Sequence, residues 1–152
     1  MITEDYVSFE VAKLLKEKGF DEACLYYYRT ETTLGKEYTN LAFIDEYLHN
    51  SEIKYGTYEE CVCTAPTLQM AMKWLRETYK LHIEVEVLKP YVLDDTKKRT
   101  VPSDRVEFHA SIIFTDQWND ALEEFKNTGV GWYSTYEEAV EAALKYCLTK
   151  LI

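Results

Sequence analysis

The segment at positions 82–88 has the cleanest alternation of apolar and polar residues in the chain, and it restricts the fold more than any other feature. The apolar positions are Ile83, Val85 and Val87, and the polar positions between them are Glu84 and Glu86. Because successive side chains of a β-strand point to opposite faces, this pattern predicts a strand with one buried face and one face in solvent. Half-buried strands of this kind are typical of antiparallel sheets.

A second alternation covers residues 105–114 and predicts another half-buried strand. If this strand pairs with the one at 82–88, their polar residues share one face: Glu84, Glu86, Glu107 and His109. Carboxylates beside a histidine are candidate catalytic groups, because close neighbours separate their pKa values for general acid–base chemistry. The same pattern arises on any solvent-facing side of a sheet, so a solvated outer face is the alternative interpretation.

Three segments have the 3.6-residue apolar spacing of amphipathic helices. The first covers residues 8–18, with Ser8 as a plausible N-cap. The second ends near Lys80 and has Pro66 in its first turn, which places its cap at Thr64 or Ala65. The third begins at a capping box and carries a continuous apolar stripe almost to the C-terminus. The residues of that box are Ser134 and Glu137.

The remaining segments are less regular. Strands are expected at residues 23–30 and 58–63, where aromatic residues, Val and Cys dominate. Short helical turns are expected around Leu41, Ile44 and Leu48, and again over residues 120–126, with Ala121, Leu122 and Phe125 facing inward. Residues 89–103 are expected to form a charged loop, and residues 129–133 a short strand or turn.

These elements predict one α+β domain over residues 1–152. We expect a mostly antiparallel sheet of about four to five strands, packed by two long helices and an N-terminal helix. No Pro-rich, Gly-rich or Ser-rich linker divides the chain, which has only 5 glycines and 3 prolines.

Acidic residues outnumber basic residues 27 to 17, which gives a formal net charge of −10. The excess is divided equally between the two halves of the chain, so it forms neither an acidic tail nor a basic arm. A surface of this sign repels phosphate backbones, and we expect no direct binding of nucleic acid. No apolar run approaches the roughly 20 residues of a membrane span, and the acidic N-terminus lacks a signal-peptide layout. We therefore expect a cytoplasmic protein without membrane contact.

The sequence contains no motif for a cofactor. Gly129 and Gly131 form a G-x-G that Trp132 and Tyr133 follow, and this fits a turn better than a phosphate-binding loop. Cys61-Val-Cys63 is too closely spaced for a zinc knuckle, and no second Cys or His pair has ligand spacing. We therefore expect neither a cofactor nor a metal site.

Aromatic residues give the stronger indication of a binding role. The chain has 13 tyrosines, and two groups of aromatic residues lie in predicted strands or near turns. Tyr and Trp are favoured at protein interfaces because they add large contact area and keep a polar atom. A role in the core and its rim is the alternative. The candidate binding residues are Tyr26, Tyr27, Tyr28, Trp118, Trp132 and Tyr133.

Three blocks of the sequence resemble a group of small uncharacterised proteins encoded by phages and prophages of gut Bacteroides and their relatives. The blocks are residues 8–20, residues 65–77, and the C-terminal helix with Thr135–Ala139 and Lys145–Leu148. They cover about a third of the chain and consist of helical core motifs. The resemblance implies an origin in a mobile element and a cytoplasmic setting, and it carries no activity or site residues.

The absence of a catalytic motif, the even negative charge and the tyrosines together favour a non-enzymatic accessory protein that binds another protein. The acidic surface would suit a basic partner. The alternative is a small hydrolase or transferase that uses the Glu84, Glu86, Glu107 and His109 face. A self-assembling structural component is a third, weaker hypothesis.

Overall fold

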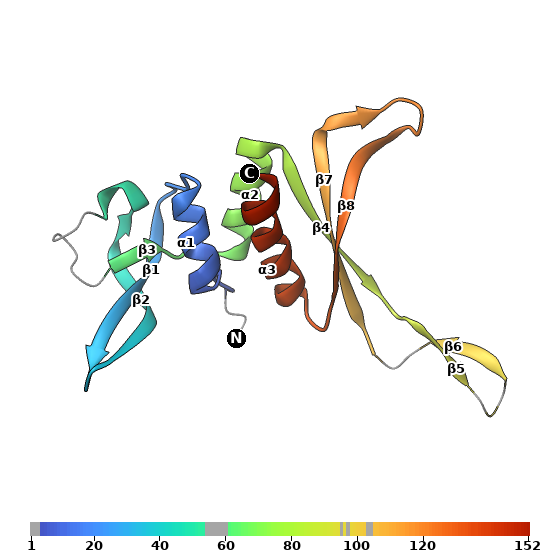
Figure 1. Cartoon of the computed structure of the whole chain (residues 1–152), viewed down its shortest axis with the longest axis horizontal. Coiled ribbons are helices and arrows are strands. Elements are labelled where there is room, and N and C mark those ends of the chain that lie inside the picture. The colour runs from blue at the N-terminus through green and yellow to red at the C-terminus, as the bar shows by residue number, and fades with distance from the viewer. Residues whose placement is uncertain (1–3, 54–60, 95, 97, 103–104) are drawn as a thin grey trace.

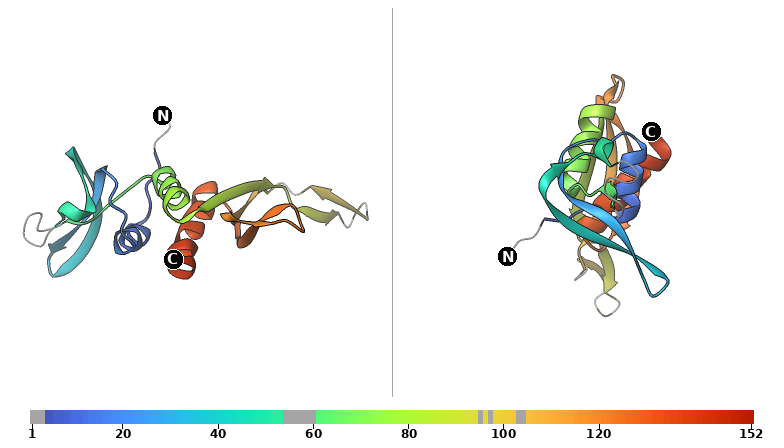
Figure 2. Two further views of the ribbon diagram at one scale, coloured as in Figure 1. Left: turned by 90° about the horizontal axis from the view of Figure 1, so that it is seen from above. Right: turned by 90° about the vertical axis from the view of Figure 1, so that its left-hand side faces the viewer.

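The structure of the chain is a computed structural model that describes residues 4–53, 61–94, 96, 98–102 and 105–152. The molecule is elongated, with its three helices in the middle and a β-sheet on either side of them (Figure 1). A view from above shows the same order, because the helices again separate the two sheets (Figure 2).

The helices are α1 (Phe9–Glu17), α2 (Leu68–Tyr79) and α3 (Tyr136–Tyr146), with a 3-10 turn η1 (Asn50–Glu52) and a π-helical turn η2 (Cys147–Leu151). The first four strands are β1 (Cys24–Thr33), β2 (Lys36–Leu48), β3 (Cys61–Thr64) and β4 (Leu81–Leu88). The others are β5 (Tyr91–Asp94), β6 (Arg99–Pro102), β7 (Glu107–Asn119) and β8 (Glu124–Tyr133).

The described strands form three separate antiparallel sheets. Sheet I has the order β2-β1-β3, sheet II has the order β4-β7-β8, and β5 and β6 form a hairpin between β4 and β7. The prediction of an antiparallel α+β fold is confirmed. The prediction of one sheet with four to five strands is wrong, because the helical layer lies between sheets I and II and prevents their edges from joining (Figure 1).

One continuous core links the helices to both sheets. Buried side chains of α1, α2 and α3 meet Cys24 and Cys63 from sheet I, and Ile83 and Ile112 from sheet II. Burial of this apolar surface is the main force that holds the two sheets to the helices. Among the described residues, no helix has the length and apolar character to cross a membrane.

Two of the three helix caps lie one to three residues after the predicted positions. Ser8 caps α1 as expected, and its side chain accepts a hydrogen bond from the Val11 amide. The cap of α2 is Thr67, which follows Pro66, and the cap of α3 is Thr135. Each Thr hydroxyl accepts a hydrogen bond from the amide three residues later, which satisfies a free N–H in the first turn of its helix.

The predicted helical turns around Leu41, Ile44 and Leu48 are wrong, because these residues belong to the 13-residue strand β2. The reason is a two-residue turn at Leu34 and Gly35, whose φ angles are 53° and 75°. Positive φ at both positions is the geometry of a type I′ hairpin turn, which aligns β2 along the whole of β1.

The other two irregular segments also form hairpins. Residues 120–126 are not helical, because a turn ends at Glu123 and β8 begins at Glu124. Ala121, Leu122 and Phe125 are consequently exposed, although we expected them to face inward. The predicted loop at 89–103 contains β5 and β6, which pair with each other. The predicted strand at 58–63 begins at Cys61 in the described part, and residues 58–60 lie outside it.

Candidate functional site: an acidic and aromatic face of sheet II

The register of sheet II brings the predicted polar residues together. In the β4–β7 pair, Glu84 lies opposite Ser111 and Glu86 lies opposite His109. On the other side of β7, His109 lies opposite Trp132 of β8. Because cross-strand partners project from the same side of a sheet, these side chains share one face.

The opposite face of sheet II holds this arrangement in place. Ile83, Ala110 and Ile112 are buried in the core against the helices, so the alternate residues must face solvent. A slip of one residue in the register would expose this core set, and the packing therefore fixes which residues appear on the outer face.

His109 and Trp132 form the centre of the outer face. Their ring centroids are 4.6 Å apart with an interplanar angle of 34°. A Cβ atom added at Gly129 would lie 3.3 Å from His109 Nε2, so the imidazole lies close above the Gly129 backbone. Trp132 remains 52% exposed, which leaves much of its indole available for contact.

Carboxylates surround this aromatic pair. Glu84 and Glu86 are exposed and Glu107 is partly buried. We name the surface formed by Glu84, Glu86, Glu107, His109 and Trp132 the acidic–aromatic face. None of the described positions that the register places on this side is Lys or Arg: His82, Glu84, Glu86, Leu88, Glu107, His109, Ser111, Ile113, Asn127, Gly129 and Trp132.

The geometry of this face suits binding better than catalysis. Its carboxylates are exposed or only half-buried, so water reaches them and screens their interactions. The cavities described below are lined by other residues. Among the residues that the structure describes, no three His, Cys, Asp or Glu side chains are grouped to hold a metal ion.

The three consecutive tyrosines of β1 lie on both sides of sheet I, as their alternation predicts. The Tyr28 hydroxyl donates to the Val7 carbonyl at 2.7 Å, and its ring packs edge-on against Phe9. Tyr28 therefore has a structural role. On the same side, the ring of Tyr26 lies between those of Tyr6 and Phe43, at 4.4 and 5.3 Å. Tyr27 points to the other side of the sheet.

Burial, together with the nearby Tyr26 and Glu4, raises the pKa of Tyr6 to about 12. The phenol of Tyr6 therefore stays protonated under ordinary conditions. We assign this aromatic row beside α1 to packing at the rim of sheet I.

Trp118 and Tyr133 are separate from the acidic–aromatic face. Trp118 lies next to the turn that joins β7 and β8, and its ring packs edge-on against Phe125 at 4.8 Å. Both residues line an open cavity of about 650 Å³. Tyr133 is the neighbour of Trp132 in β8 but packs toward the core. Of the six predicted binding residues, only Trp132 joins the predicted carboxylates.

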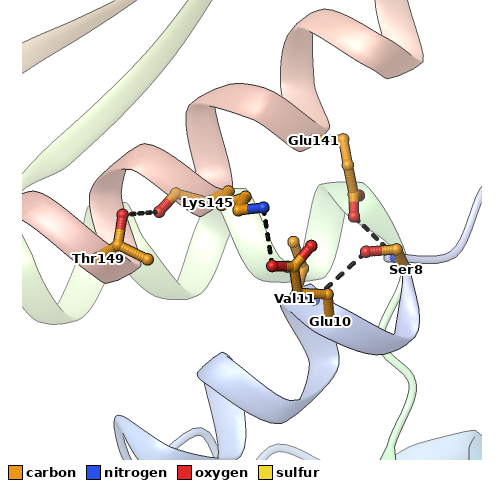
Figure 3. Close-up of polar contacts among 6 residues, drawn as sticks. All are labelled: Ser8, Glu10, Val11, Glu141, Lys145 and Thr149. Atoms are coloured by element: carbon orange, nitrogen blue, oxygen red, sulfur yellow. Dashed lines mark hydrogen bonds and ion pairs between the residues drawn. The ribbon is translucent and has the colours of Figure 1, made fainter.

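A polar cluster between α1 and α3 was missed in the sequence (Figure 3). Glu141 accepts a hydrogen bond from the Ser8 amide at 2.9 Å, and Lys145 lies 2.7 Å from Glu10. Glu141 and Lys145 are four residues apart on one helix face, which is the sequence signal for such a cluster. They line a cavity of about 340 Å³. Because each of these charges has a partner in the protein, we assign the cluster to helix packing.

Comparison with known proteins adds no assignment to this geometry. The chain matches no protein-family model, no curated protein and no solved structure.

Proposed function

We propose that this chain is a non-enzymatic accessory protein that binds a basic segment of another protein on the acidic–aromatic face. The observation that supports the proposal is the register of sheet II, which gathers Glu84, Glu86 and Glu107 around His109 and Trp132. A mobile-element origin and a cytoplasmic setting, both implied by the sequence resemblance, are part of the same proposal.

The chemistry of this face fits a cationic ligand. The carboxylates attract Lys and Arg side chains, and the net charge of −10 steers a basic partner toward the molecule. The exposed indole of Trp132 offers a flat π surface, over which a guanidinium or ammonium group is attracted by the ring quadrupole. Aromatic residues at the centre of a polar surface are typical of interface hot spots.

The hydrolase or transferase hypothesis uses the same side chains but receives less support. General acid–base catalysis depends on groups whose pKa values are separated by burial or by close neighbours. Glu84 and Glu86 are exposed to water, and the face as a whole is open. An open acidic surface suits recognition of charge.

Binding to a Lys-rich and Arg-rich peptide library, measured by calorimetry, tests the proposal. The double variant Glu84→Gln/Glu86→Gln is expected to weaken binding about tenfold, and Trp132→Ala is expected to weaken it by a similar factor. The matched control is Glu37→Gln/Asp45→Asn, which removes the same charge from exposed positions of β2. Equal loss in the control, or no binding of any basic peptide, would contradict the proposal.

A further inference from the structure

The outer edge of β4 is open. In the described part of the chain β4 pairs with β7 alone and forms one border of sheet II. The backbone N–H and C=O groups on the other side of an edge strand are available to pair with an added strand. This edge runs directly beside Glu84 and Glu86 of the acidic–aromatic face.

The hydrogen-bond phase identifies which residues offer these groups. The Thr115 amide donates to the Lys80 carbonyl at 2.9 Å, next to the Leu81–Phe114 pair of the register. In an antiparallel ladder, residues that bond to the partner alternate with residues whose N–H and C=O point away. The backbone carbonyl of Lys80 points toward β7, so the backbone groups of the even-numbered residues of β4 form the hydrogen bonds to β7. The N–H and C=O groups of Val85 and Val87 therefore point to the open edge.

The side chains along this edge have two distinct characters. Glu84 and Glu86 are exposed on the outer face of the sheet. On the other face, Val85 is half-buried and Val87 is 59% exposed. An added strand would therefore meet carboxylates on one side and an apolar surface on the other.

We infer that the basic partner segment binds as an additional strand along β4, and this inference rests on the proposed function. Its Lys or Arg side chains occupy alternate positions beside Glu84 and Glu86. The residues between them are apolar and lie beside Val85 and Val87. Main-chain hydrogen bonds supply affinity, and the alternation of charge and apolarity supplies specificity.

Charge argues against a second copy of the chain as the occupant. Two β4 strands related by a two-fold axis would pair antiparallel, with a residue such as Val85 or Glu86 opposite itself. Centring on Val85 places Glu84 opposite Glu86, and centring on Glu86 places Glu86 opposite its own copy. Centring on Val87 avoids this contact but pairs only residues 86–88 of the two strands. Like charges directly opposite each other destabilise a strand pair, whereas a basic strand would place opposite charges beside each other and stabilise the pair.

Two peptides of equal composition test the mode of binding. The peptide Lys-Val-Lys-Val-Lys-Val-Lys has the required alternation, and Lys-Lys-Lys-Lys-Val-Val-Val has the same net charge without it. We expect the alternating peptide to bind about tenfold more tightly to the full chain. Glu84→Gln/Glu86→Gln is expected to reduce that preference.

A proline in the edge strand tests the backbone contact directly. Val87→Pro removes an outward N–H without touching the bonds to β7, and we expect about a tenfold loss of affinity for the alternating peptide. The matched control is Thr39→Pro in β2, whose N–H also points away from its neighbour β1 by the phase that the hairpin turn sets. Hydrogen exchange on the unmodified protein adds a readout that needs no variant, because the bound peptide should slow exchange at Val85 and Val87.

The outcomes separate this inference from the proposed function. Equal binding of both peptides, with unchanged exchange at Val85 and Val87 and a loss in Glu84→Gln/Glu86→Gln, would overturn strand addition and leave the proposed function in place. Failure of every basic peptide to bind would overturn both. If Glu84→Gln/Glu86→Gln instead dimerises and the unmodified protein binds neither peptide, the carboxylates only protect the edge from self-association, and both are again overturned.

Discussion

The side-chain carbonyl of Asn50 accepts a hydrogen bond from the Thr64 amide at 3.0 Å, although 14 positions separate the two residues in the chain. The Asn50 amide group also donates to the Phe20 carbonyl at 2.8 Å. This one buried side chain therefore joins the end of α1, the turn η1 and strand β3.

We predict that Asn50→Ala lowers the free energy of unfolding by about 3 kcal/mol, because two buried backbone groups lose their partners. Urea unfolding followed by circular dichroism measures this change. Ser51→Ala is the control, because it removes only the hydrogen bond between the exposed Ser51 side chain and Asp21 and keeps the bond from the Ser51 amide to Asp21. A loss below about 1 kcal/mol would show that water replaces the missing bonds.

A substitution at Leu34, in the hairpin turn of sheet I, should stabilise the protein. Leu34 is 98% exposed and has a φ of 53°, a conformation that costs a non-glycine residue about 1 kcal/mol. Asn accepts this conformation, and Asn-Gly is the preferred pair in a type I′ turn. We expect Leu34→Asn to raise the free energy of unfolding by about 0.5–1 kcal/mol, whereas Leu34→Val should lower it. Urea unfolding of both variants measures these changes in the free energy of unfolding.

His49 gives the protein a dependence on pH. A hydrogen bond to the Asp21 carbonyl raises the pKa of His49, and the negative charges of Glu52, Asp21 and Glu22 act in the same direction. Because the folded-state pKa lies above the unfolded value of about 6.5, the contribution to stability is fully present below that value. It is lost as the pH rises through the folded-state pKa.

Thermal unfolding of the wild type and of His49→Gln, measured across the pH range in which His49 titrates, tests this dependence. We expect the wild type to be the more stable protein in mildly acidic buffer, with the difference shrinking above neutral pH. NMR titration of the imidazole gives an independent value. A pKa at or below about 6.5 would contradict the expected contact with the Asp21 carbonyl.

The cysteines should react slowly in the folded protein. Burial raises the pKa of Cys63 and Cys147 to about 12, and that of Cys24 and Cys61 to about 11. Because the thiolate is the reactive form, iodoacetamide should modify the native chain slowly and begin at Cys61, which is only half-buried. Mass spectrometry locates the label. Rapid labelling of Cys63 or Cys147 in native protein would contradict this burial.

Much of the helical layer can be predicted from the sequence. The apolar stripe of α3 is continuous, and Val140, Ala143 and Leu144 are buried as the spacing predicts. Strand β2 could not be predicted, because most of its side chains are exposed and give no clear alternation. Its conformation depends on pairing with β1 and on the turn at Leu34, which tertiary context imposes against the preference of Leu.

The candidate site was predictable in part. Alternation predicts that Glu84, Glu86, Glu107 and His109 share a face if their strands pair, and the β4–β7 register confirms that condition. The position of Trp132 beside His109 was not predictable. It depends on an irregularity in the β7–β8 ladder, where Ala110 lies opposite Gly131 and Ser111 lies opposite Gly129. Such a shift changes which residues of β7 and β8 lie opposite each other, and the apolar pattern of the sequence does not reveal it.

The shared core of the helices has a consequence for how the molecule comes apart. Because α1, α2 and α3 are covered by a sheet on either side, removal of one sheet would expose apolar helix surface to water. Neither half should therefore persist as an independent fragment. Loss of either sheet should coincide with loss of the other in a single cooperative transition.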